Sequence, residues 1–150
     1  MIRVVRWIIA IPVGIVAAVG MHFLMSLGFS LGHGFETVAS FWEASDMNGM
    51  PISGTYILFV TRATTAAAFV GVIAYIVPAY HKYVGIAFAT VVALGSLVLL
   101  AYLTRVAYNA GLSLGIGAWY RNILEFVSYG LGGIAGAAIG SGAGERRTNA

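Results

Sequence analysis

Three ionisable residues lie inside long apolar stretches of this sequence, where a charged side chain is costly. They are His22, Arg62 and Glu125, and a charge at the centre of a membrane-spanning helix costs about 2.5–3.5 kcal/mol on the lenient insertion scale. A helical rise of about 1.5 Å per residue, counted from the middle of each stretch, puts all three roughly 5 or 6 Å to one side of the bilayer midplane. A base, a cation and a carboxylate are therefore predicted at one depth.

The favoured pairing joins Arg62 to Glu125 across two helices, because a planar guanidinium suits a carboxylate and pairing removes most of the cost of either charge. His22 could donate to Glu125 or cap the pair. Arg121 is a rival partner, four residues before Glu125 on the same helix, but its long side chain can also reach the solvated interface. We predict an intramembrane polar cluster of His22, Arg62, Arg121 and Glu125.

Buried polar groups often fix helix register and partner choice, and this structural interpretation is favoured here over an ion or proton relay. A metal site is less well supported, since His33 and Glu36 form a lone H-x-x-E without a second histidine. A bis-histidine haem is disfavoured because His22 and His81 are predicted at opposite membrane faces. The absence of cysteine excludes thiolate sites, and no nucleophile elbow, phosphate loop or carboxylate dyad is found. We predict no catalytic residue, metal or cofactor, and no enzyme.

Four apolar segments must position the cluster. The 150 residues are 60% hydrophobic and only 9% charged, too little charge to cover a soluble domain, and each apolar run approaches the ~20 residues of a spanning helix. The predicted fold is all-α: a polytopic membrane protein folded as a four-transmembrane-helix bundle, with residues 1–150 forming one domain. The spans are expected at about 7–29, 54–77, 83–103 and 118–142.

A single substantial loop, residues 30–53, joins the first two spans. Phe35, Val38, Phe41 and Trp42 follow helical spacing within it, which predicts a short amphipathic helix in the membrane interface. A lid packed over the mouth of the bundle is the alternative, and the two are compatible.

Small residues form faces on which other helices can pack. The last span carries a glycine at every fourth position of one stripe: Gly132, Gly136, Gly140 and Gly144. The first span carries Gly14 and Ala18 on a similar face with His22. In lipid, bare backbone allows close helix approach, and dispersion takes over from the hydrophobic drive. Both faces are predicted to be helix-packing surfaces.

Lysine and arginine set the orientation. Five of them fall on one predicted side of the membrane: Arg3, Arg6, Lys82, Arg146 and Arg147. The positive-inside rule then puts both termini and the turn near Lys82 in the cytoplasm. The first segment is interpreted as a retained signal anchor because its apolar run is long and lacks a persuasive cleavage site. The default location is a bacterial inner membrane.

Two classes of function remain. The first is a structural or accessory subunit that packs through its small-residue faces in a larger membrane complex or a homo-oligomer. The alternative is a transport or channel element that uses the His/Arg/Glu cluster. Expected partners are the lipid bilayer and other membrane subunits or a second copy. Nucleic acid is not expected, because the net charge of +3 comes from few basic residues, mostly at segment ends.

Overall fold

The computed structural model describes residues 2–38, 52–109 and 116–148, all but a few of them helical. Four long helices account for most of these residues: α1 (Ile2–His33), α3 (Ile52–Ile76), α4 (His81–Asn109) and α5 (Ile116–Thr148). Each is long and apolar enough to cross a membrane. The predicted all-helical class and the four helices of spanning length are therefore confirmed.

α1, α4 and α5 extend beyond the apolar segments that predict them at both ends, whereas α3 begins two residues before its predicted segment and ends one residue before the end of it. Hydropathy detects only the part suited to hydrocarbon, whereas a helix continues until its backbone is broken. α4 reaches Asn109 because neither proline nor glycine occurs between Gly95 and Gly111. α3 ends at Ile76, two residues before Pro78, which cannot continue a helix.

The predicted interfacial helix is described only in part. Residues 35–38 are helical and follow Gly34, whose φ of 91° breaks the chain direction after α1. Val38 is 2% exposed and packs with Ile57 and Phe29. Phe41 and Trp42 lie outside the described residues. The interfacial helix as a whole stays a prediction.

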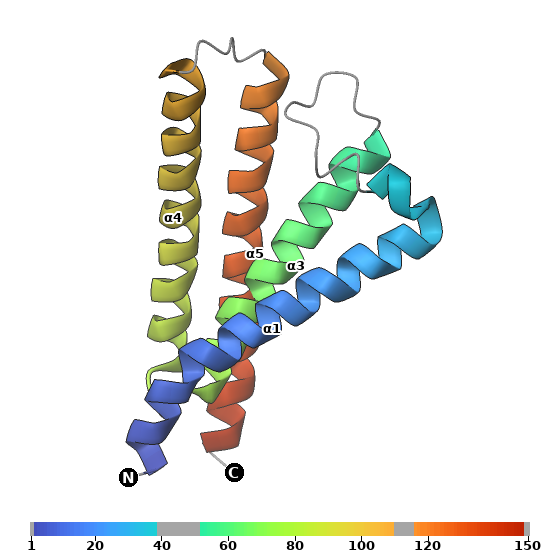
Figure 1. The fold of residues 1–150 in the computed structure, drawn as a ribbon. Coiled ribbons are helices and arrows are strands. Elements are labelled where there is room, and N and C mark those ends of the chain that lie inside the picture. Colours follow the sequence, from blue (N-terminus) through green and yellow to red (C-terminus); the bar gives the residue numbers. More distant parts are fainter. Residues whose placement is uncertain (1, 39–51, 110–115, 149–150) are drawn as a thin grey trace.

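α3 is the central helix. It makes close backbone contacts with α1, α4 and α5, and α5 also packs on α4, whereas α1, among the described residues, makes no such contact with α4 or α5. α4 and α5 stand side by side along their length, whereas α1 and α3 lean away from them toward one end (Figure 1). Both chain termini and the α3–α4 turn lie at the opposite end (Figure 1), as an even number of crossings requires.

The glycine stripe explains why α3 approaches α5 so closely. Three small residues of α3 face three glycines of α5, in the pairs Ala63–Gly132, Ala67–Gly136 and Gly71–Gly140. A Cβ added to Gly132 would stand 2.7 Å from the Cα of Ala63, far inside van der Waals contact. The two backbones therefore touch without side chains between them, and dispersion between them stabilises the pair.

A second small face of α5 packs on α4. A Cβ on Gly133 would lie 3.2 Å from the Cα of Ala89, and one on Gly85 would lie 3.1 Å from the Cα of Ala137. α5 is thus glycine-rich because two neighbours approach its backbone from different sides.

α1 packs on α3 through a narrower stripe. Ala10 is buried with Ile73 and Val77, and Gly14 leaves room for the side chains of Ile73 and Phe69. Ala18, expected on this face, is half-buried.

His81 joins three helices at the end that carries the termini. It is 5% exposed, and its Nδ1–H donates to the carbonyl oxygen of Ala74 over 2.7 Å. Its ring covers Gly144, where an added Cβ would lie 2.8 Å from the ring carbon Cε1. Gly144 therefore leaves space for the imidazole ring of His81, whereas the three other glycines of its stripe leave space for the backbone of α3.

His81→Ala is expected to lower the free energy of unfolding by about 1–3 kcal/mol, because it removes a buried hydrogen bond and leaves a cavity over Gly144. Reversible unfolding in mixed micelles, followed by circular dichroism, measures this. Tyr83→Ala is the control, since Tyr83 lies on the same turn of α4 and is 74% exposed. Equal stabilities of the two variants would contradict the packing described for His81.

Candidate functional site

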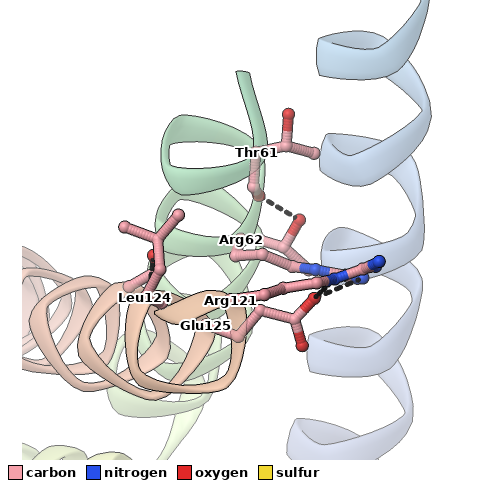
Figure 2. Close-up of polar contacts among 7 residues, drawn as sticks. Thr61, Arg62, Arg121, Leu124 and Glu125 are labelled. Atoms are coloured by element: carbon pink, nitrogen blue, oxygen red, sulfur yellow. Dashed lines mark hydrogen bonds and ion pairs between the residues drawn. The ribbon is translucent and has the colours of Figure 1, made fainter. Parts of the chain in front are cut away.

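α3 and α5 bring Arg62 and Glu125 together inside the spanning helices. Nη2 of Arg62 lies 3.5 Å from Oε1 of Glu125. Nε of Arg121 lies 3.5 Å from the same oxygen, so two guanidinium groups share one carboxylate oxygen (Figure 2). Both distances are at the long limit of a hydrogen bond, so the attraction between the groups is mainly electrostatic.

The position of this contact follows from the helix packing. Arg62 immediately precedes Ala63, and Glu125 lies two helical turns before Gly132. Because Ala63 and Gly132 form one end of the close contact between the two backbones, long side chains just beyond that point can reach across. Arg121 is one turn further along α5 and meets Glu125 along its own helix.

The three charged side chains are partly buried, with exposed fractions of 24% for Arg62, 16% for Arg121 and 17% for Glu125. Such burial removes much of the water that screens a surface ion pair, so their interaction is stronger than that of an exposed pair.

Two further groups border the ion pair. The Arg62 guanidinium carbon lies 5.8 Å from the centre of the Tyr129 ring, within the range of a cation–π contact. His22, on α1, is close enough to Arg62 to interact with it electrostatically, and α1 runs past the ends of both guanidinium groups (Figure 2). The structure therefore brings Arg62, Arg121 and Glu125 together, with His22 of α1 near Arg62.

Thr64 and Thr65 of α3 turn their hydroxyls to their own helix, whereas the buried hydroxyl of Thr61 has no hydrogen-bond partner among the described residues. The hydroxyl of Thr64 donates to the carbonyl oxygen of Val60 and that of Thr65 to the carbonyl oxygen of Thr61, at 2.8 Å and 2.7 Å. A neighbouring cavity of ≈ 400 Å³ between α1, α3 and α5 is lined by apolar residues apart from Thr64 and Tyr75.

The histidine and acidic residues do not assemble into a metal centre in the part of the chain that the structure describes, where no group of three or more such side chains comes together. The ring of His33 packs edge-on against that of Phe29 at 6.4 Å. Asp46, another acidic residue of the predicted loop at residues 30–53, lies outside the described residues.

Two features of the site lack a clear sequence signal. Tyr129 is one of many tyrosines, and only the helix contact brings its ring to Arg62. The α3 stripe of Ala63, Ala67 and Gly71 has fourfold spacing in the sequence, but it overlaps the Ala- and Thr-rich run at 61–68. Searching every span for small residues at fourfold spacing could have found it.

No protein-family model, curated protein or solved structure matches this chain. The functional proposal therefore rests on the helices, their contacts and the surfaces they leave open.

Proposed function

We propose that this chain is a small integral membrane protein that acts as a structural or accessory subunit, in a larger membrane complex or a homo-oligomer. The observation that carries the proposal is the uncovered surface of α1. Its one close backbone contact in the described residues is with α3, and 11% of its most apolar window is buried, the same share as in α4 and far less than the 39% in α3.

The small faces of α5 are occupied within the chain, so we assign partner contacts to α1. Large apolar side chains cover its open side: Ile8, Ile15, Val16, Val19, Phe23, Leu24 and Leu31. Gly20 and Gly28 lie between them with open space around their backbone, which would let a further helix approach closely.

We also propose a bacterial inner membrane with both termini in the cytoplasm. Arg146 and Arg147 form the last turn of α5, and Lys82 stands at the start of α4, at the end that carries the termini (Figure 1). The Arg147 guanidinium stacks over the Tyr75 ring at 5.4 Å. This excess of basic residues supports the orientation.

In this proposal the cluster fixes the register of α3 on α5, because sliding by one turn would separate Arg62 from Glu125. A transport or channel element is the second candidate, favoured by ionisable side chains that three helices bring near one another. The apolar lining of the neighbouring cavity supports the structural role over this alternative.

Photo-crosslinking in native membranes tests the proposal. Benzoylphenylalanine at Phe23, which is 65% exposed on α1, is expected to link the chain to a second copy or to a subunit that co-migrates with it on native-detergent sizing. The matched control is the same substitution at Phe69, which packs inside against Phe88. Lipid adducts alone at Phe23, with a monomer on sizing, would contradict the proposal. Glu125→Gln or Arg62→Met variants that assemble normally but lose a measured flux would favour transport.

A further inference from the structure

α4 and α5 enclose a long groove on one side of their contact. They touch where Gly85 meets Ala137 and Gly133 meets Ala89, and beside these contacts they leave a cavity of ≈ 460 Å³ that begins at Lys82. A second cavity of ≈ 340 Å³ shares Phe126 with it and continues toward Thr104 and Asn122.

The larger cavity is mainly apolar and charged at one end, and the smaller one has Asn122 and Thr104 in its lining, where the Asn122 amide donates to the Thr104 hydroxyl. Lys82 is the only charged residue among those that line the larger cavity. The hydroxyls of Thr90 and Ser141, also in its lining, donate to carbonyl oxygens of their own helices, those of Ile86 and Ala138. A ligand that fits must therefore combine an anionic end with an apolar body.

The dimensions match one leaflet of a bilayer. From Lys82 to Leu94, both in the lining, a helix rises about 18 Å, and half of a hydrocarbon core is about 15 Å. Lys82 is the second residue of α4, so its backbone belongs to the first turn, where the unpaired amides and the positive end of the helix dipole lie.

We propose that this groove binds one anionic phospholipid from the leaflet on the side of the termini. The phosphate lies at Lys82 and the first turn of α4, and one acyl chain lies between Ile86, Thr90 and Leu94 on one wall and Gly130 and Ile134 on the other. Basic pockets between spanning helices on the cytoplasmic side are sites of this kind.

Charge favours a lipid over a second copy of the chain. A copy docked symmetrically in the same orientation would bring its own Lys82 to the same level, and two cations would then face each other at the rim. A phosphate complements the same rim directly.

The test measures binding of dioleoylphosphatidylglycerol to the purified full chain in detergent micelles, from the rise of the thermal unfolding midpoint with lipid concentration. Dioleoylphosphatidylcholine is expected to give a much smaller rise. Lys82→Gln is expected to weaken phosphatidylglycerol binding about fivefold, which corresponds to ~1 kcal/mol per basic residue near an anionic surface. Arg146→Gln, which removes an exposed cation from the same end of the molecule, is expected to change binding less than twofold.

Two glycine variants test the groove itself. Gly130 and Gly95 both have open space where a Cβ would be added, but only Gly130 lines the groove. Gly130→Leu fills the groove and is expected to abolish the preference for phosphatidylglycerol, whereas Gly95→Leu retains it. If Gly130→Leu does not fold, Thr90→Leu replaces it as the groove-filling variant, because Thr90 is an exposed residue of α4 in the lining opposite Gly130.

Three results would overturn the proposal. Equal losses in Lys82→Gln and Arg146→Gln would mean diffuse attraction to a basic end. Unchanged binding in the folded groove-filling variant would mean that the acyl chain lies elsewhere. A disulfide-linked dimer of Ile134→Cys in phosphatidylglycerol vesicles would assign the groove to a second copy, because the chain has no other cysteine.

Discussion

Gly132→Ala is expected to lower the free energy of unfolding by about 1–3 kcal/mol, the usual cost of overpacking. The new methyl group would lie 2.7 Å from the Cα of Ala63 and against its carbonyl group. These are backbone atoms of a helix, so they cannot rotate aside as a flexible side chain does. α3 must move away from α5, and the neighbouring contacts at Gly136 and Gly140 weaken with it.

Gly130→Ala is the matched control, on the same helix and two residues away. No atom outside its own turn lies within 4 Å of a Cβ at Gly130. Alanine also loses less backbone freedom on folding than glycine, so this variant is expected to be as stable as the wild type or slightly more stable.

Reversible unfolding in mixed micelles of a mild detergent and dodecyl sulfate measures both variants, with circular dichroism as the signal. Gly140→Ala, which faces Gly71 in the same stripe, is expected to behave like Gly132→Ala. If the Gly132 and Gly130 variants unfold at the same dodecyl sulfate fraction, α3 and α5 do not approach as described.

The helices themselves could be predicted because the physics leaves few choices. A run of about 20 apolar residues in a bilayer must satisfy its backbone hydrogen bonds internally, and a helix does so. The fourfold spacing of Gly132, Gly136 and Gly140 likewise predicts a close approach by some other helix.

The choice of that helix could not be predicted from spacing. Rows of small residues occur in every span, among them the rows that begin at Gly14, Ala63 and Gly85. Each row fits any other about equally well, because the pattern carries no information on the pairing. The second face of α5, formed by Gly133 and Ala137, lies one residue further along from Gly132 and Gly136 and is hidden by them in the sequence.

The tilt of α1 away from α4 and α5 could not be predicted for a related reason. In water, an apolar face must be buried, so its position on a helix indicates the neighbour. In lipid, acyl chains cover apolar side chains as well as a protein does, and α1 is apolar on nearly every side. Nothing in its sequence fixes how much of it α3 covers.

In the charged cluster, two ion pairs that the sequence presents as alternatives occur together. Spacing makes Arg62 and Arg121 rivals for Glu125, yet both lie 3.5 Å from its Oε1. A carboxylate has several acceptor positions, so it can serve one partner along its helix and another across the interface.

Glu125→Gln is expected to lower the free energy of unfolding by about 2 kcal/mol. Removing one partner of a fully buried ion pair costs about 3–5 kcal/mol, and the three side chains here keep 16–24% of their exposure, so the loss is smaller. The variant leaves two guanidinium groups beside each other with no carboxylate between them. Leu131→Ala, which removes an exposed apolar side chain from the same helix, is expected to change stability little.

A second substitution separates the contributions of the two arginines. In the Glu125→Gln background, Arg62→Met is expected to restore part of the lost stability, because it removes a charge that α3 holds inside the membrane and leaves Arg121 able to extend toward water. Arg121→Met in the same background is expected to restore less, since Arg62 then remains at depth. The same mixed-micelle unfolding measures the single and double variants together. If Arg121→Met restores more stability than Arg62→Met, the charge that needs Glu125 most is the one on its own helix, and the cluster does not fix the register of α3 on α5.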